Sequence, residues 1–423
     1  MNNRTQSLQW YDRAAKVIPG GVYGHTSPAA SLPLYFPYYI DRAEGAYVWD
    51  VDGNLYIDFI CAYGPIVLGH NHPEVEIAAE VERRKGGLYS QPNTVMVELA
   101  ELLVNRIDFA GWSVFGKNGS DMTTWAMQVA RQHTARKKVL VVQGAYHGVD
   151  AWTNPSPGGI IEEDRMHIHD FPWNDTKAFL ELVNRFPEQI AALMITPYHH
   201  PTFGPNVEPD PEFVNTVNQT CQDKGIVLIL DDIRAGFRLN AAGSHVVYGW
   251  EPDMACYCKA LGNGYPVSAT VGKEELKSSA GKVFLTGSYW NDAVSLSAAK
   301  RCLEVLEEEN IPEKLAAAGS RLLSKIESIA ANYGIRVKGN SPAAAPTITF
   351  EDDQDLRKLQ RFSELCAERG VLFHPHHNWF ISAAHTEEVI EEAIVVARQA
   401  LEEMASEMKN NSAGNGTGAS AGN

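Results

Sequence analysis

The sequence lacks any uninterrupted apolar run of membrane length, and residues 1–21 lack the apolar core of a signal peptide. It also lacks a basic block interleaved with aromatic residues, and its formal net charge is 36 − 52 = −16. These absences argue against a membrane protein and against nucleic acid or anionic membrane as partners. We therefore expect a cytoplasmic protein that acts on small molecules.

Cysteine is also scarce, and its placement gives no metal site. Cys256 and Cys258 form a C-x-C pair, but no second pair completes a set of four ligands. The histidines His199, His200, His374, His376 and His377 have no carboxylate or cysteine at ligand spacing, and we expect them to form hydrogen bonds at the rim of a pocket or at the surface. We expect no metal, and six reduced, buried cysteines, at positions 61, 221, 256, 258, 302 and 366.

In the middle of the chain, short apolar segments alternate with helical patterns. Strands are predicted at 138–142, 191–196 and 226–231, and helices at 120–131 and 211–225. Almost wholly apolar strands between helices are typical of a mainly parallel, doubly wound α/β sheet. A hairpin is predicted earlier, at Gly45 to Asp58, around Asp52-Gly53-Asn54.

A chain of 423 residues, 44% of them hydrophobic, can form one large and one smaller domain. Helical patterns at 293–310, 311–333 and 387–408 surround strand-like segments, which indicates a smaller α+β domain near the carboxyl end. The predicted parts are an N-terminal segment that packs with the small domain (1–60), a large domain (61–300), the small domain (301–408) and a disordered low-complexity tail (409–423).

Three predicted loops at strand ends carry chemistry. Asp231 ends one apolar strand, Lys259 follows another, and Lys117-Asn118-Gly119-Ser120 opens a helix whose N–H groups can hold an anion. The pair Asp231-Asp232 also fits a magnesium-binding strand of a nucleotide hydrolase, but the required G-x-x-x-x-G-K-[ST] loop is absent. A helix-capping aspartate is the plainer alternative.

The combination of these loops favours pyridoxal 5'-phosphate (PLP). Its aldehyde needs a lysine that is partly desolvated, which Lys259 supplies. Asp231 would keep the pyridine nitrogen protonated, and the helix N-terminus at 119 would take the phosphate. Tyr146, at a third strand end, could stack on the ring.

Several motifs resemble the class III PLP-dependent aminotransferases over residues 8 to about 400, in the branch that contains glutamate-1-semialdehyde aminomutase. The resemblance implies the fold of type I PLP-dependent transferases. The motifs are AAKVIPGGVY (14–23), GAYVWDVDGNLYIDF and YGPIVLGHNHPEV (45–75), NGSD (118–121), DDIRAGFR (231–238), CKALGNGYP (258–266) and FISAAHTEE (380–388).

The resemblance implies a role for each matching residue. Lys259 would form the Schiff base and shuttle the proton, Asp231 would pair with the pyridine nitrogen, and Ile233 would pack on the ring. Phosphate would be held by Gly119 and Ser120, with Tyr146 stacked above the ring. Ser288 matches a threonine that reaches the phosphate from the neighbouring subunit, which implies a homodimer with shared active sites.

Substrate positions depart from the aminomutase pattern. Tyr23-Gly24-His25 replaces the arginine that binds its substrate's carboxylate, and the acidic residue before the C-terminal motif is missing. At these positions the sequence resembles the fumonisin amine transaminases. Those enzymes move the amino group of an aminopolyol to pyruvate. The implied pocket residues are Tyr23, Tyr63, Tyr198, Trp379 and Arg234. Two roles are possible for Arg234. It could contact the cofactor or a substrate carboxylate, or it could turn outward and form a salt bridge.

We therefore expect a PLP-dependent aminotransferase. It would move an amino group from an amine without an α-carboxylate to a keto acid, which we expect to be pyruvate, by a ping-pong mechanism. One alternative is an aminomutase or amino acid racemase, which needs no keto acid. The other is a non-catalytic PLP-binding protein, although the intact Lys259 and Asp231 argue against it.

Overall fold

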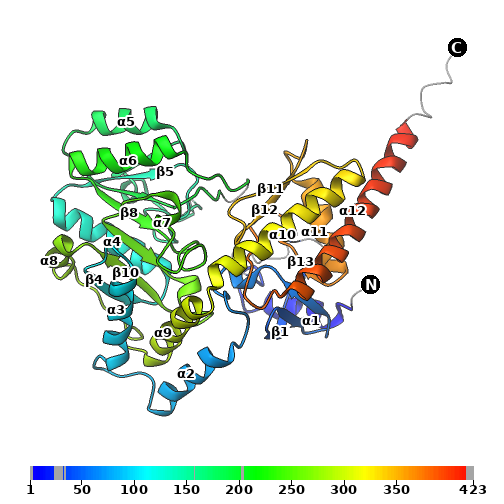
Figure 1. The fold of residues 1–423 in the computed structure, drawn as a ribbon, viewed down its shortest axis with the longest axis horizontal. Helices are drawn as coiled ribbons and strands as arrows, with labels where there is room; N and C mark the ends of the chain where they lie inside the picture. Colours follow the sequence, from blue (N-terminus) through cyan, green and yellow to red (C-terminus); the bar gives the residue numbers. More distant parts are fainter. Residues whose placement is uncertain (1–2, 23–31, 33–34, 157, 202–203, 416–423) are drawn as a thin grey trace. The chain divides into compact units, whose positions relative to one another are not determined.

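The structure is a computed structural model that describes residues 3–22, 32, 35–156, 158–201 and 204–415, with side chains described as far as residue 410. The chain divides into two compact units (Figure 1). The larger is Ala62–Leu315, and the smaller combines Met1–Cys61 with Ala316–Asn423. No helix among the described residues is long and apolar enough to cross a membrane.

The larger unit is built on a seven-stranded sheet with strand order β4-β10-β9-β8-β7-β5-β6. Only β10 runs against its neighbours, and the pairs from β9 to β6 are parallel. The mainly parallel α/β fold expected from the sequence is therefore confirmed. The strands are β4 (Trp112–Gly116), β5 (Lys138–Val142), β6 (Ile168–Phe171), β7 (Ile190–Ile195), β8 (Val227–Asp231), β9 (Met254–Tyr257) and β10 (Ser268–Gly272).

Helices cover this sheet, and α4 packs across β4, β7, β8, β9 and β10. Its apolar face, which includes Met122, Trp125 and Val129, lies in the core with the sheet. The predicted helix at 120–131 is thus confirmed, with one more turn at its carboxyl end. The helices are α2 (Pro73–Arg84), α3 (Thr94–Arg106), α4 (Gly119–Thr134), α5 (Thr176–Arg185), α6 (Pro211–Lys224), α7 (His245–Tyr248), α8 (Lys277–Ala280) and α9 (Ala293–Glu308).

Strand periodicity explains which face of the sheet carries the chemistry. Val227 and Ile229 of β8 belong to the core beneath α4. Because successive side chains of a strand alternate between faces, Asp231 points to that same face. The helix α4 begins at Gly119, just after β4 ends at Gly116, so its N-terminus lies at the same edge of the sheet. Asp231 and the N-terminus of α4 therefore meet at the carboxyl edge.

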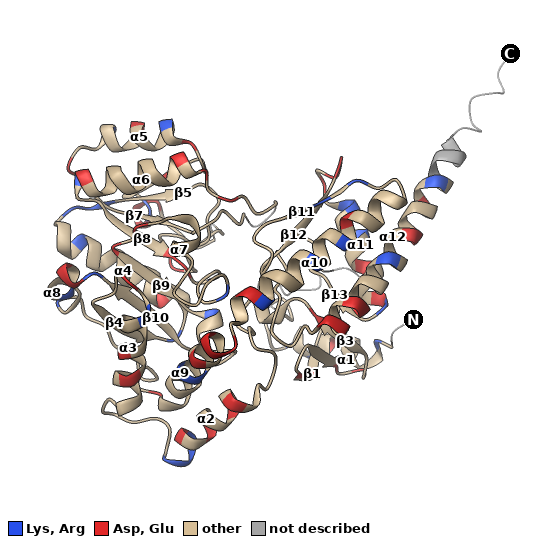
Figure 2. Ribbon diagram, viewed as in Figure 1, with Lys and Arg blue, Asp and Glu red and all other residues tan. Residues whose placement is uncertain are grey.

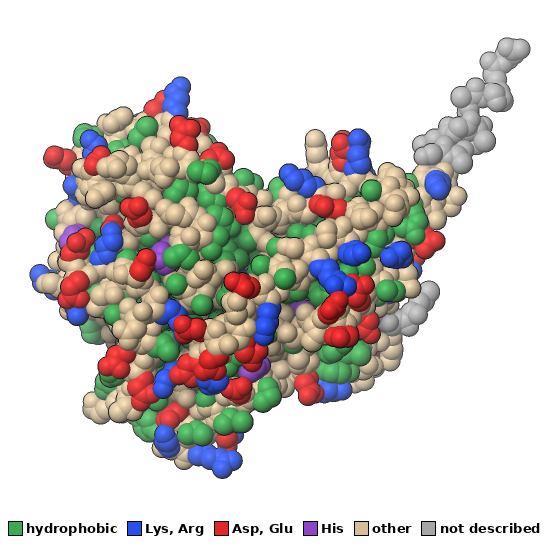
Figure 3. Space-filling model, in the orientation of Figure 1, with side chains coloured by type: hydrophobic (Ala, Val, Ile, Leu, Met, Phe, Trp, Pro, Cys, Tyr) green, Lys and Arg blue, Asp and Glu red, His purple; other side chains and the backbone are tan. Residues whose placement is uncertain are grey.

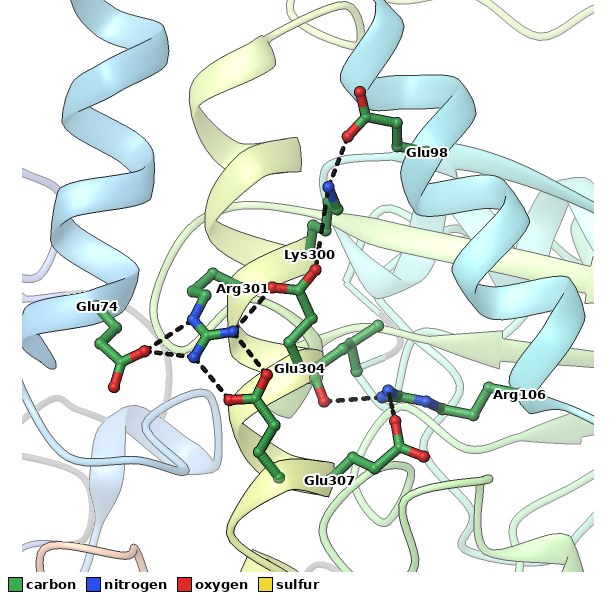
Figure 4. Close-up of polar contacts among 9 residues, drawn as sticks. Glu74, Glu98, Arg106, Lys300, Arg301, Glu304 and Glu307 are labelled. Atoms are coloured by element: carbon green, nitrogen blue, oxygen red, sulfur yellow. Dashed lines mark hydrogen bonds and ion pairs between the residues drawn. The ribbon is translucent and has the colours of Figure 1, made fainter.

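An ion-pair network joins three helices of the larger unit (Figure 4). Arg301 of α9 pairs with Glu74 of α2 and with two carboxylates of its own helix, Glu304 and Glu308. The neighbouring Lys300 pairs with Glu98 of α3 at 2.6 Å. These contacts attach α9 to α2 and α3, so the larger unit extends past residue 300, where the sequence indicated its end.

The smaller unit contains two small sheets. In the first, β1, β2 and β3 are antiparallel, and β13 is parallel to β3. Antiparallel β11 and β12 form the second. The predicted hairpin is confirmed as β2 and β3, whose turn is held by Gly53 N–H donating to the Asp50 carbonyl. The strands are β1 (Ile40–Glu44), β2 (Tyr47–Asp50), β3 (Leu55–Asp58), β11 (Val337–Asn340), β12 (Thr347–Phe350) and β13 (Val371–Leu372).

The helices of the smaller unit differ from expectation at the carboxyl end. They are α1 (Thr5–Ala14), α11 (Arg357–Glu368), α12 (Glu387–Asn415) and most of α10 (Ile311–Asn332). The last helix, α12, continues to Asn415 instead of ending at Met408, because extending an existing helix avoids the cost of a new nucleus. The remainder of the tail predicted to be disordered, 416–423, lies outside the described residues.

Charges of both signs are distributed over the helices of both units (Figure 2). On the face drawn in Figure 3, acidic and basic side chains are mixed with apolar ones, and the residues described there form no continuous basic patch. This distribution agrees with the net charge of −16. Within the described part of the chain, no group of three or more histidine, cysteine or acidic residues could hold a metal ion.

Candidate active site

A cavity of about 410 Å³ opens at the carboxyl edge of the large sheet. Its walls come from the segments that follow β4, β5, β7, β8 and β9. Ligands of open α/β sheets bind at this edge, and the volume lies in the range of small-molecule sites. The cavity brings together most of the site residues expected from the sequence, namely Gly119, Ser120, Tyr146, Asp231, Ile233, Arg234 and Lys259.

The N-terminus of α4 forms one end of the cavity. The Asp121 carboxylate accepts hydrogen bonds from the backbone N–H groups of Lys117 (3.1 Å) and Asn118 (2.8 Å), which fixes the turn before the helix. The Ser120 hydroxyl accepts from the Val149 N–H at 3.1 Å and can still donate its own proton. The first turn of a helix carries N–H groups and a positive dipole end, so this end of the cavity suits a phosphate.

Two glycines allow close packing around this anion site. A Cβ at Gly119 would lie 2.6 Å from Ile233 Cδ1, and one at Gly148 would lie 2.4 Å from Ser120 Oγ. Gly148 also has a φ of +125°, a region that other residues rarely adopt. Glycine at both positions therefore lets the helix terminus, Ser120 and Ile233 come together.

Asp231 lies on the floor of the cavity and is held by a histidine. His147 Nδ1 lies 2.7 Å from Asp231 Oδ2, and both side chains are almost fully buried. Since a carboxylate can only accept, His147 donates this hydrogen bond. Ile233 N–H also donates to Asp231 Oδ1, at 3.3 Å. The remaining lone pairs of Asp231 are available to a cationic ring nitrogen.

Lys259 projects into the same cavity from a single 3-10 turn, Lys259–Leu261, directly after β9. Its φ of +39° is uncommon for a side-chain-bearing residue, and such strain concentrates at functional sites. Burial, and to a smaller extent the positive charge of Arg234, lower the pKa of Lys259 from 10.5 to about 7. The amine is therefore largely neutral above pH 7 and can act as a nucleophile or base.

Of the other residues expected to bind substrate or cofactor, Tyr63, Tyr198 and Ser288 belong to the larger unit but do not line this cavity. Tyr198 is fully buried beside His200, and Tyr63 is half-buried in a left-handed turn with a φ of +64°. Trp379 is buried in the smaller unit, where it stacks on Phe373 with ring centroids 4.1 Å apart. Ser288 is exposed in the loop between α8 and α9. Tyr23 lies outside the described residues.

One histidine of this site, His147, was not predicted from the sequence. His147 was overlooked beside Tyr146, although its place after β5 gave the same signal of a strand end. His200 lines the cavity as well, and burial lowers its pKa well below the usual range. His147 could have been suspected from its strand-end position, but its partner Asp231 is 84 residues away and only the fold reveals the contact.

The residues of the cavity fit PLP. The helix terminus with Ser120 matches the phosphate, Asp231 matches the pyridine nitrogen, and Lys259 matches the aldehyde. Ile233 and Tyr146 provide apolar and aromatic surface for the ring. The fit includes a lysine whose burial favours the neutral form that reacts with an aldehyde.

Comparisons with known proteins agree with this geometry. The model of the family described as class-III aminotransferases matches residues 29–405. The chain belongs to the class-III aminotransferases. It is an enzyme, which removes the alternative of a non-catalytic PLP-binding protein, and its cofactor is PLP.

Three relatives of this aminotransferase are informative. It is 40% identical to the aminopentol aminotransferase of Sphingopyxis macrogoltabida, with 93% of each chain covered. It is 33% identical to the glutamate-1-semialdehyde 2,1-aminomutase of Methanopyrus kandleri, over 94% of this chain and 98% of the relative. Its fold matches the PLP form of the FumI protein of Sphingopyxis sp. MTA144 with a TM-score of 0.94 and 38% identity, over 96% and 98% of the two chains. This aminotransferase is thus close to the aminopentol transaminases.

Proposed function

We propose that this aminotransferase moves an amino group from an amine without an α-carboxylate to a keto acid, with pyruvate as the acceptor. The observation that supports the donor class is the similarity to a relative named for an aminopentol, which is an amine. Donor and acceptor would use the same cavity of about 410 Å³ in turn, so the carbonyl product leaves before the keto acid enters. The kinetics would then be ping-pong.

When bound, PLP supplies an electrophilic carbon and an electron-withdrawing ring that stabilises negative charge on the substrate carbon. The N-terminus of α4 and Ser120 anchor the phosphate, and Ile233 and Tyr146 orient the ring. Asp231, oriented by its hydrogen bond with His147, would pair with the ring nitrogen. Lys259 Nζ takes a proton from the substrate carbon and returns it in the next step, which requires the neutral amine that burial favours.

The experiment that tests this proposal is a donor panel assayed with pyruvate, with 2-oxoglutarate and without any acceptor. We expect amines and amino alcohols to react with pyruvate, and no turnover without an acceptor. Sustained turnover of one substrate without an acceptor would instead favour the aminomutase alternative, which the similarity to glutamate-1-semialdehyde 2,1-aminomutase supports. Borohydride reduction followed by peptide mapping should attach the cofactor at Lys259, and Lys259→Ala should lose turnover.

We also propose a homodimer in which Ser288 completes the active site of the neighbouring subunit. The loop that carries Ser288 exposes Phe284 and Tyr289, which are 86% and 66% exposed in the single chain. Exposed apolar surface in one segment is a mark of protein–protein contact sites. A second copy of the chain would cover them and bring Ser288 to the phosphate site of its partner, because Ser288 is not among the residues that line the cavity of the single chain.

Mixing two inactive variants tests the shared site. Lys259→Ala lacks the reactive amine, and Ser288→Asp places a negative charge against the phosphate. In a mixed dimer one site carries both defects and the other carries neither, so random exchange should restore about a quarter of the wild-type sites. If Ser288 served its own chain, or if the protein were a monomer by sedimentation, mixing would restore no activity.

A further inference from the structure

Arg234 occupies a fixed position in the cavity, three residues after Asp231. It belongs to a tight turn that follows β8, in which Gly236 N–H donates to the Asp232 carbonyl at 2.8 Å. A Cβ at Gly236 would lie 2.6 Å from that carbonyl oxygen and 2.5 Å from the Tyr257 ring, so the turn closes only with glycine there. The backbone that carries Arg234 is therefore preorganised, and its half-buried side chain lines the cavity.

The charges around Arg234 make it a candidate anion-binding group. Among the described residues that line the cavity, Arg234 is the only arginine, and Lys259 is the only lysine. His200 is neutral, since burial and then the charge of Arg234 lower its pKa. Arg234 and Lys259 line the same cavity, and the positive charge of Arg234 is one of the causes that lower the pKa of Lys259. The cavity is also lined by the carboxylates of Asp121, Asp150 and Asp231, so a substrate carboxylate that enters it is repelled by these groups and attracted to the guanidinium.

A cation at this place suits the chemistry of a 2-keto acid. Its carboxylate is bonded directly to the carbonyl carbon that receives the amino group, so the residue that binds it must lie beside the reacting centre. A guanidinium pairs with a carboxylate through two parallel hydrogen bonds. An amine donor without an α-carboxylate has no group that needs this contact.

We propose that Arg234 binds the carboxylate of the acceptor and thereby selects a 2-keto acid in one half-reaction, with little part in the other. This inference rests on the proposed function, because it assumes an acceptor of that class. It distinguishes Arg234 from a cofactor-binding residue, whose loss would weaken both half-reactions and the retention of PLP alike.

The test measures the two half-reactions separately, by the absorbance of the bound cofactor in single turnovers. The variants are Arg234→Gln, which removes the charge, and Arg234→Lys, which keeps it. Arg185→Gln, on the exposed last turn of α5, is the matched control for a change of one charge. We expect Arg234→Gln to raise the pyruvate concentration that gives half the maximal single-turnover rate by about 10- to 100-fold. This is a typical range for losing a charge-assisted contact. Arg234→Lys should recover part of this loss.

Two further measurements do not depend on turnover. Calorimetric binding of propanoate, an unreactive carboxylate, should be detectable with wild type and Arg185→Gln and be lost in Arg234→Gln. The affinity for PLP should stay the same in all of them. Propanal, an acceptor without a carboxylate, should react equally well with wild type and Arg234→Gln, so the preference for pyruvate over propanal falls.

Three results for Arg234→Gln would each overturn the inference. They are equal losses of rate in both half-reactions, a weaker affinity for PLP, and an unchanged half-saturating concentration of pyruvate. A separate outcome concerns the proposed function. If wild type transferred no amino group to any keto acid, that function would be refuted. Propanoate binding that still depended on Arg234 would nevertheless support a carboxylate site at this residue.

Discussion

The cofactor-free enzyme should contain one lysine that becomes neutral near pH 7. Burial, and then Arg234, lower the pKa of Lys259 from 10.5 to about 7. At about 1.4 kcal/mol per pH unit, this amounts to a preference of about 5 kcal/mol for the neutral amine over a lysine in water. At pH 8 about nine-tenths of Lys259 would be neutral, compared with less than about one-hundredth of an ordinary lysine.

The assay is covalent modification of amines between pH 5.5 and 10 in the cofactor-free protein, quantified by mass spectrometry of peptides. The rate at Lys259 should rise with a midpoint near pH 7 and level off above it. Peptides that carry Lys177, whose side chain is 87% exposed, report the reaction of the reagent with a lysine in water. Identical pH profiles for Lys259 and Lys177 would refute the reasoning, because burial would then have no effect on the amine.

The lowered pKa of Lys259 also makes the stability of the folded protein depend on pH. Between pH 7 and 10.5 the unfolded chain holds the proton of Lys259 and the folded chain has lost it. The stability of the cofactor-free wild type should therefore rise with pH in this window, relative to Lys259→Met. Below pH 7 the full cost of the buried charge is present, and Lys259→Met should be the more stable protein. Urea unfolding at pH 6 and pH 10 measures the difference, and an unchanged gap would contradict the assigned pKa.

Three further substitutions test other parts of the molecule. Gly119→Ala places a Cβ 2.6 Å from Ile233 Cδ1, so we expect a loss of about 1–3 kcal/mol in thermal unfolding and weaker PLP binding. Asp231→Asn keeps the shape but removes the charge that His147 holds, and should lower kcat about 100- to 1,000-fold with the unfolding temperature little changed. Arg301→Ala leaves its former carboxylate partners to repel each other and should cost about 1–2 kcal/mol in urea unfolding at low salt, less in 1 M salt.

Much of the cofactor site could be predicted from the sequence because parallel strands bring their carboxyl ends to one edge. Asp231 and Lys259 each follow a short apolar strand, and Gly119 opens a helix, so the topology alone places them together. The structure brings all three into one cavity. The proximity of these residues was predictable because each residue's position depends on the local strand or helix pattern.

Features that depend on contacts between distant segments could not be predicted. The reversed direction of β10 is set by its pairing with β4 and β9, and its five residues carry no signal of direction. The contact between His147 and Asp231 joins two loops that only the sheet brings together. The left-handed turn at Ala62 and Tyr63 contradicts the local preference of both residues, so neighbouring structure must hold it.

The two adjacent aspartates show how the fold resolves an ambiguous motif. Because side chains alternate along a strand, Asp231 faces α4 and His147, while Asp232 faces away from them. Asp232 accepts hydrogen bonds from both the backbone N–H (2.8 Å) and the hydroxyl of Ser244. Burial raises the pKa of Asp232 to about 7, so this carboxyl gives up its proton less readily than an exposed one. Asp231 is thus the residue suited to a cationic ring, and Asp232 fixes the chain that follows, including the turn that presents Arg234.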